Sequence, residues 1–174
     1  DRKAGGRLMQ TRRVLLGALA ASLLAACASS PAPDAQTIYL VRHAEKASGD
    51  DPELTLVGRA RAEILAAELA DADLAAIYST NTRRTMETAA PTARATGLTV
   101  LPYDGNNLKT FANMLRATPG NILVVGHSNT TPALVKALGG KPGTPIVEAT
   151  EYDRLYVLTA NGRHYRTELR RYGN

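Results

Sequence analysis

Two apolar runs that each lead to a histidine constrain the fold of this chain more than any other feature. Residues 38–41 are followed by Arg42 and His43, and residues 122–125 lead through one glycine to His127. Short runs of branched apolar residues are typical of buried β-strands. In open α/β sheets the ligand crevice lies beyond the carboxyl ends of the strands. We therefore expect His43 and His127, two of only three histidines in the chain, to lie in one crevice.

Strand-like and helix-like segments alternate along the rest of the chain. The pattern predicts strands at residues 37–43, 75–79, 98–101, 121–127, 154–159 and 164–170. It predicts helices at residues 55–70, 82–96, 107–117 and 132–138. The dipeptide Asn161-Gly162 is a strong hairpin signal between the last two strands. This order predicts an α/β three-layer sandwich: a mostly parallel central sheet, helices on both faces, and an antiparallel C-terminal strand pair.

The first predicted helix shows which of its faces we expect to be buried. Thr55 is a good N-cap residue for this helix. An apolar stripe follows it, formed by Val57, Ala60, Ile64, Leu65 and Leu69. Apolar residues at this spacing lie on one face of a helix, and we expect that face to pack against the sheet.

The N-terminal segment has the features of an export signal. Arg12 and Arg13 precede an apolar run over residues 14–26. This run is shorter than the roughly 20 apolar residues that a transmembrane helix needs. Cys27 follows Leu24-Ala25-Ala26 and resembles the lipobox cysteine of bacterial lipoproteins, which becomes lipidated. The arginine pair also resembles a twin-arginine signal, so the export route stays open. We expect an export signal over residues 1–27, a flexible tether rich in serine and proline over residues 28–36, and one folded domain over residues 37–174.

The charge and the cysteine content exclude several classes of function. The formal net charge is +5, but residues 1–27 carry five cations and one acid, which leaves about +1 for the rest. The domain therefore lacks the general basic face of a nucleic-acid-binding protein. Cys27 is the only cysteine, so residues 37–174 offer no disulfide, thiolate zinc site or thiol nucleophile.

Four ordered segments resemble the histidine phosphatase superfamily, also called phosphoglycerate mutase-like. They are Arg42-His43, residues 54–58, residues 78–89 and residues 124–127, so the resemblance spans essentially the whole domain. In the third segment the family spacing places Thr88-Ala89 at the fourth and fifth positions after its arginine. That spacing selects Arg84 and leaves Arg83 at a variable position on the helix surface.

The resemblance implies a role for each of these side chains. His43 would attack phosphorus through one ring nitrogen while the other donates a hydrogen bond to backbone. Arg42 and Arg84 would bind the phosphoryl oxygens, because planar guanidinium groups match phosphate geometry. His127 would neutralise charge that develops in the transition state. No metal or other cofactor is implied. Glu45 could orient an arginine or could be a solvated loop acid.

The proton donor to the leaving group is the least defined part of the site. Many relatives use an acid between the second arginine motif and the second histidine, where this chain has only Glu87 and Asp104. Asp104 follows a strand and could overlook the crevice, although an aspartate before glycine also suits a turn. Glu151 and Asp153 are further candidates. The short interval resembles the compact branch of the superfamily, which includes phosphohistidine phosphatases.

We therefore expect a phosphatase that hydrolyses phosphate monoesters or phosphohistidine through a phosphohistidine on His43. The expected partners are a phosphorylated small molecule or phosphoprotein as substrate, and a membrane through the lipid anchor only. Alternatives are an envelope lipoprotein that binds a phosphorylated ligand without catalysis, and a mutase-like phosphotransferase. The expected location is the bacterial envelope on the periplasmic side, at the outer membrane because Ala28 rather than an aspartate follows Cys27.

The anchor is testable by substitution of its one cysteine. We expect the unaltered protein to fractionate with membranes, since lipid chains contribute about 0.8 kcal/mol per buried CH₂. Cys27→Ser should yield an unprocessed or soluble protein with normal kinetic constants. A soluble unaltered protein whose mature N-terminus lies elsewhere than Cys27 would show that the chain carries no such anchor.

Overall fold

The structure is a computed structural model that describes residues 36–162 and 164–173. Its elements in chain order are β1 (Thr37–Arg42), α1 (Leu56–Glu68), β2 (Leu74–Ser79), α2 (Arg83–Thr96), β3 (Val100–Pro102), α3 (Leu108–Ala117), β4 (Asn121–Gly126), α4 (Thr130–Ala137), β5 (Arg154–Asn161) and β6 (His164–Arg171). The predicted export signal with Cys27, and all of the predicted tether except Gln36, lie outside the described residues. None of the described helices is long and apolar enough to span a membrane.

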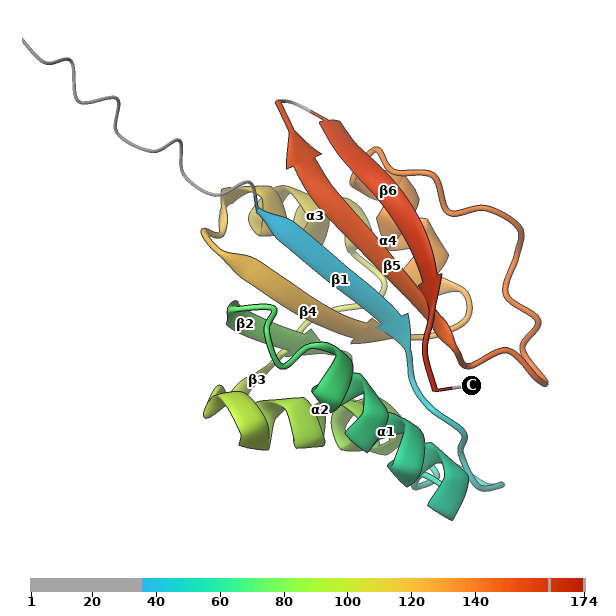
Figure 1. The fold of residues 1–174 in the computed structure, drawn as a ribbon. Coiled ribbons are helices and arrows are strands. Elements are labelled where there is room, and N and C mark those ends of the chain that lie inside the picture. The colour runs from blue at the N-terminus through green and yellow to red at the C-terminus, as the bar shows by residue number, and fades with distance from the viewer. Residues whose placement is uncertain (1–35, 163, 174) are drawn as a thin grey trace, which may run out of the picture. The chain divides into compact units, whose positions relative to one another are not determined.

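One six-stranded sheet has the strand order β3-β2-β4-β1-β5-β6 (Figure 1). The pairs β1–β4, β2–β4 and β2–β3 are parallel, whereas β5 runs antiparallel to β1 and to β6. The predicted mostly parallel sheet with an antiparallel C-terminal pair is therefore confirmed. The hairpin turn lies one residue later than the dipeptide predicted, because Asn161 still pairs with His164.

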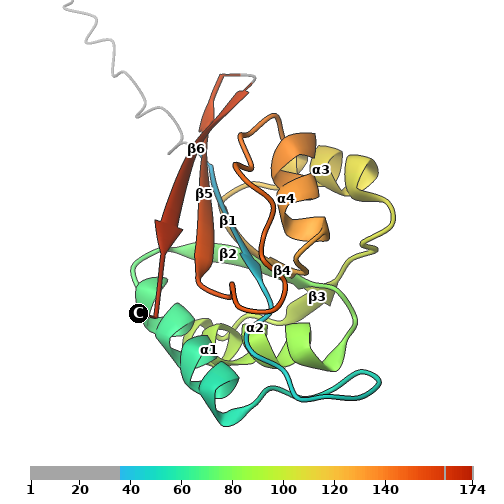
Figure 2. The same ribbon diagram turned by 90° about the vertical axis from the view of Figure 1, so that its right-hand side faces the viewer.

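Helices cover both faces of the sheet, as the three-layer prediction requires (Figure 2). On one face, α1 and α2 pack against each other and bury Leu65 and Ala89 with Val41 and Val125 of the sheet. On the other face, α3 and α4 form a second apolar cluster with Ile38 and other strand residues of opposite orientation. Successive residues of each buried strand point alternately into the two apolar clusters. Both faces of these strands are therefore buried, which is why the strands are apolar runs without a polar face.

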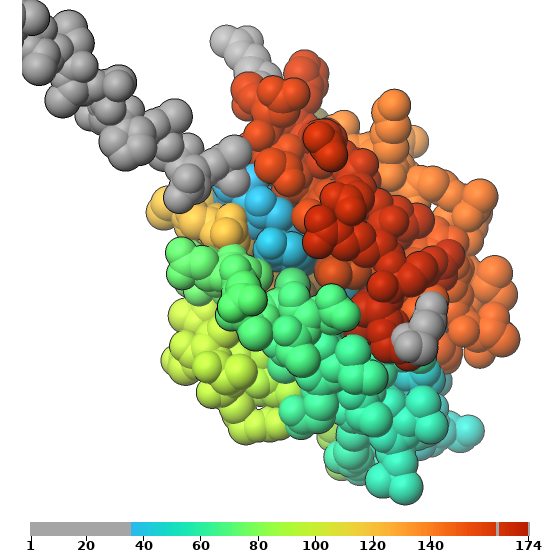
Figure 3. Space-filling model, viewed as in Figure 1, coloured from blue at the N-terminus to red at the C-terminus, as the bar shows by residue number. Residues whose placement is uncertain are grey.

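The predicted burial of the α1 stripe is partly wrong. Leu65 and Leu69 are buried as expected, but Val57 is 62% exposed, Ile64 is 39% exposed and Ala60 also faces solvent. In the space-filling view α1 lies at the surface below β5 and β6 (Figure 3). The helix is therefore rotated so that most of its larger apolar side chains lie outside the core.

Small residues set the orientation of α1. Gly58 and Ala62 are buried, and Ala62 packs with Ala44 and Leu54 in a cluster beside the segment that follows β1. A Cβ at Gly58 would lie 2.1 Å from the carbonyl oxygen of Glu45, far inside van der Waals contact. A helix that packs this closely on backbone needs glycine at the contact, so the close approach decides which face is buried.

Gly58→Ala tests this contact directly. In an ordinary helix position the change stabilises by about 0.5–1 kcal/mol. Here we expect destabilisation of about 1–3 kcal/mol, because α1 or the backbone of Glu45 must move. Thermal unfolding of the variant measures the effect, with exposed Ala60→Gly as the control that reports helix propensity alone. An unchanged or raised melting temperature for Gly58→Ala would rule out the close approach.

Candidate active site

A cleft of about 780 Å³ collects four of the residues that the sequence singled out: His43, Arg84, Asp104 and His127. Register explains how the two histidines meet. Arg42 at the end of β1 pairs with Gly126 at the end of β4, so both histidines follow paired positions. The amide of His43 then donates to the carbonyl of Gly126 at 2.9 Å. The two imidazole rings lie edge to face with centroids 5.5 Å apart.

The ring of His43 is held in one tautomer. Its Nδ1 lies 2.8 Å from the carbonyl oxygen of Ala44, which can only accept, so Nδ1 carries the hydrogen. Nε2 is therefore the ring nitrogen with a free lone pair. Burial, together with the charges of Arg42 and Arg84, lowers the pKa of His43 to about 3. At neutral pH the side chain is an uncharged imidazole, which is the nucleophilic form.

His127 is held in the opposite tautomer. Its Nδ1 lies 3.4 Å from Nη2 of Arg84, which can only donate, so Nε2–H donates to Oγ1 of Thr80 at 2.9 Å. Thr80 in turn donates to Oγ1 of Thr85 at 3.1 Å. Burial, followed by the charge of Arg84, lowers the pKa of His127 to about 4. A phosphoryl dianion beside Nδ1 would favour the protonated form, and this is what the expected charge-neutralising role needs.

The two adjacent arginines of α2 have different surroundings. Arg84 lines the cleft, its Nη1 lies 3.6 Å from Oδ1 of Asp51, and its Nε is buried with no partner. The side chain of Arg83 is 53% exposed and forms ion pairs with Glu53 at 2.6 Å and Glu87 at 2.8 Å. The structure thus places Arg84 in the cleft and Arg83 outside it, in agreement with the motif spacing.

The threonine of the same motif connects α2 to the segment that carries His43. Thr88 Oγ1 accepts from the amide of Ala44 at 3.0 Å and donates to the carbonyl of Arg84 at 2.7 Å. Thr88 is fully buried, and so is Ala89 beside it. One helical turn therefore carries both the cleft arginine and the hydroxyl that holds the residue after His43, which explains the spacing physically.

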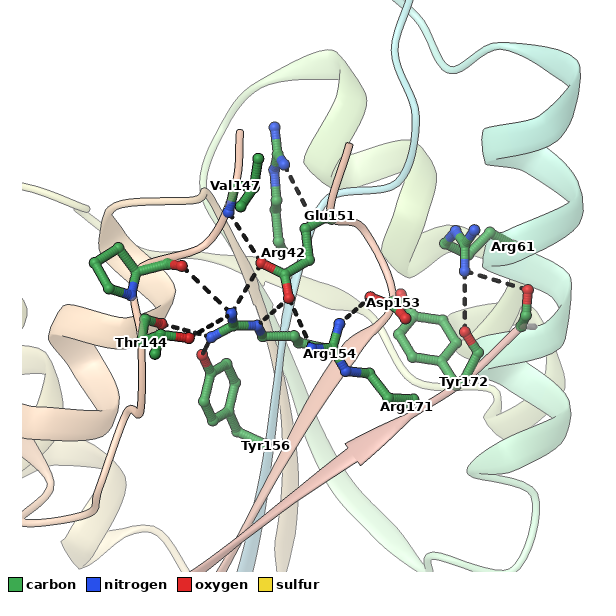
Figure 4. Close-up of polar contacts among 12 residues, drawn as sticks. Arg42, Arg61, Thr144, Val147, Glu151, Asp153, Arg154, Tyr156, Arg171 and Tyr172 are labelled. Atoms are coloured by element: carbon green, nitrogen blue, oxygen red, sulfur yellow. Dashed lines mark hydrogen bonds and ion pairs between the residues drawn. The ribbon is translucent and has the colours of Figure 1, made fainter. Parts of the chain in front are cut away.

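Arg42 is only 2% exposed and is not among the residues that line the cleft; Figure 4 shows it beside Glu151. Its Nη1 donates to the carbonyl of Glu151 at 3.0 Å, and its Cζ lies 4.1 Å from the centroid of the Tyr152 ring. Its Nε is buried without a partner. Burial lowers the pKa of Arg42. Two guanidinium groups at this site therefore have a buried N–H donor that no described protein group accepts.

Of the acids proposed as proton donor, only Asp104 lines the cleft. Its Oδ1 also accepts from the amide of Asn106 at 2.9 Å, so the residue both forms a turn and overlooks the site. The carboxylate of Glu87 accepts from the amide of Leu54 at 2.8 Å and from Arg83, outside the cleft. Glu151 and Asp153 also lie outside it, on a neighbouring hollow.

Sequence reasoning missed Glu148, a second acid on the cleft wall. It lies in the segment between α4 and β5, and its charge acts on Arg42. Glu151, which the sequence analysis did consider, lies in the same segment. The position of this segment just before β5 was therefore a signal that applied to Glu148 as well. Glu45 does orient an arginine, but outside the cleft: it binds Arg61 Nε at 2.9 and 3.0 Å.

The described residues contain no group of three or more histidine, cysteine or acidic side chains placed to hold a metal ion. The remaining cleft residues are almost all polar, and they include Lys46, Asn81, Asn106, Ser128 and Asn129. Buried guanidinium donors beside two neutral imidazoles form a site for a compact anion with several acceptor oxygens. A phosphoryl group fits that description.

Part of the chain matches a family model. The model of the histidine phosphatase superfamily (branch 1) matches residues 38–105, which include Arg42, His43, Arg84 and Asp104. No curated protein matches the sequence significantly.

Solved structures share the fold over the whole domain. A protein assigned as the phosphohistidine phosphatase SixA from Agrobacterium tumefaciens is 27% identical, with a TM-score of 0.62 over 81% of this chain and 99% of its own. The mycobacterial glucosyl-3-phosphoglycerate phosphatase is 16% identical, with a TM-score of 0.63 over 79% of this chain and 98% of its own. The alpha-ribazole phosphatase from Shigella flexneri is 16% identical, with a TM-score of 0.63 over 79% and 96%. The family model thus matches residues 38–105, and the fold of the domain is similar to that of several solved phosphatases.

Proposed function

We propose that the protein is a phosphatase that works through a covalent phosphohistidine on His43. One observation supports this most: a buried, uncharged imidazole whose Nδ1 is fixed by Ala44 lies in the cleft with Arg84 and His127. The fixed Nδ1 leaves Nε2 as the nucleophile. The donors of Arg84 and Arg42 that lack protein partners would bind the phosphoryl oxygens.

The reaction has two steps. In the first, Nε2 of His43 forms a bond to phosphorus while the bond from phosphorus to the leaving atom breaks, and an acid gives that atom a proton. In the second, water attacks the phosphohistidine, the same acid takes the proton of the water, and phosphate leaves. We assign the acid role to Asp104, which lines the cleft, and Glu148 lies in the same cleft as a second candidate. Arg42, Arg84 and His127 would balance charge on the equatorial oxygens in both steps.

The substrate class follows from the cleft wall and from the similar structures. A wall lined mainly by polar residues suits a hydrophilic leaving group, such as a sugar or a peptide side chain. The similar protein from Agrobacterium is assigned as a phosphohistidine phosphatase, which makes phosphohistidine on a protein the second substrate to test beside phosphate monoesters.

Hydrolysis of p-nitrophenyl phosphate in the presence of EDTA is the first experiment. Turnover that EDTA does not reduce supports a metal-independent phosphatase. Binding of phosphate without any turnover, on either a monoester or a phosphohistidine peptide, would instead favour the binding-only lipoprotein.

His43→Ala tests the covalent step. We expect the variant to fold and to lose turnover by at least about a thousandfold, because the nucleophile is gone. Brief reaction of the unaltered protein with labelled substrate should give a protein-bound label that is stable in base and lost in acid. Activity of the alanine variant near that of the unaltered protein would exclude the mechanism.

The pair Arg84 and Arg83 provides a matched comparison on one helix. Loss of a charge-assisted contact to the phosphoryl group costs about 2–4 kcal/mol of transition-state stabilisation. Arg84→Ala should therefore lower kcat/KM by about 30-fold to 1,000-fold. Arg83→Ala removes only exposed ion pairs and should change kcat/KM by less than about threefold. The reverse ranking in steady-state kinetics would show that the other arginine binds phosphate.

A further inference from the structure

Arg42 is a buried cation that lacks an acidic partner although an acid lies next to it. Among the described residues no carboxylate lies within 4.0 Å of its guanidinium. The group that contacts Arg42 from Glu151 is the backbone carbonyl, at 3.0 Å, and the ring of Tyr152 contacts its face. Both contacts hold the guanidinium without cancelling its charge. The charge therefore remains available to an anion in the cleft.

The side-chain carboxylate of Glu151 does not contact Arg42 and instead binds two other arginines, Arg154 and Arg171 (Figure 4). Arg154 Nε lies 2.7 Å from Oε1 and its Nη2 lies 2.9 Å from Oε2, a two-pronged ion pair. Oε2 also accepts from the amide of Val147 at 2.9 Å, and Arg171 Nη2 lies 2.8 Å from Oε1. These contacts, led by the hydrogen bond from Arg154, lower the pKa of Glu151 to about 2. The carboxylate is thus ionised at neutral pH and its acceptor sites are filled.

Arg154 is itself fixed in place. Its side chain is 4% exposed, and beyond Glu151 it donates to the carbonyl of Thr144 at 2.6 Å and to the hydroxyl of Tyr156 at 3.1 Å. The segment from Thr144 to Glu151 is therefore wrapped around one guanidinium. That segment also carries Glu148 into the cleft.

We propose that Arg154 is a positioning residue for the phosphate site, which keeps the carboxylate of Glu151 away from Arg42 so that Arg42 stays free for the phosphoryl group. The proposal rests on the phosphatase function proposed above. Without Arg154, an ionised carboxylate beside a buried unpaired guanidinium is attracted to it. The resulting ion pair would compete with phosphate for the same donors.

A double-mutant cycle separates this role from simple support of the fold. Arg154→Met removes the guanidinium that binds both carboxylate oxygens of Glu151 and leaves Glu151 charged. The second change, Glu151→Gln, removes the negative charge that would compete with phosphate for Arg42. Orthophosphate affinity by calorimetry and p-nitrophenyl phosphate kinetics are measured for both single variants, the double variant and the unaltered protein. Arg170→Ala is the matched control, because Arg170 is an exposed arginine paired with Glu168.

We expect Arg154→Met to weaken orthophosphate binding by about tenfold or more, since a competing buried ion pair costs at least that much. For Glu151→Gln alone, the orthophosphate affinity should stay within about threefold of that of the unaltered protein. The backbone carbonyl of residue 151, which contacts Arg42, is still present in this variant. The double variant should recover to within about threefold of Glu151→Gln, which mere loss of support would not allow. Arg170→Ala should leave affinity unchanged.

Three results would overturn the proposal: unchanged affinity in folded Arg154→Met, a double variant no better than Arg154→Met, or a loss in Glu151→Gln as large as in Arg154→Met. If Arg154→Met does not fold, Arg154→Lys replaces it, because lysine keeps one charge but lacks the fork. Its loss should also be reversed by Glu151→Gln. Failure of the proposed function itself would differ, since the unaltered protein would then neither hydrolyse the substrate nor bind orthophosphate.

Discussion

The parallel pairing of β1 with β4 is the constraint on which the rest of the site depends. It places Arg42 opposite Gly126 and brings the amide of His43 to the carbonyl of that glycine. Gly126 has no room for a side chain, because a Cβ there would lie 2.7 Å from the hydroxyl of Tyr103 and 2.9 Å from that of Thr130. The close packing at this strand end is what sets the two histidine rings 5.5 Å apart.

Burial of the Arg42 guanidinium, which has no carboxylate of the described residues within 4.0 Å, is the second organising feature. Removal of such a group from water without an acid partner costs free energy. The protein limits that cost for Arg42 with a carbonyl and an aromatic ring, which are neutral groups. Burial, together with the charges of Arg42 and Arg84, lowers the pKa of both histidines, so both imidazoles are uncharged at neutral pH.

The sequence predicted the strands, the helices and their order because buried strands and helix caps have strong local signals. It also separated Arg84 from Arg83, since the position of Thr88 is fixed by one turn of helix. The apolar stripe of α1 is only partly buried, because the deciding contact is between Gly58 and the backbone of Glu45, which hydrophobic spacing does not reveal. Glu148 was missed for a related reason: its place in the cleft depends on a loop wound around Arg154. The export signal stays a prediction.

The hydrogen bond from the amide of Ala44 to Thr88 couples the segment that carries His43 to helix α2. The backbone of Ala44, next to His43, is thus hydrogen-bonded to the helical turn that also carries Arg84. A local opening of α2 would therefore displace Arg84 and the backbone next to His43 together.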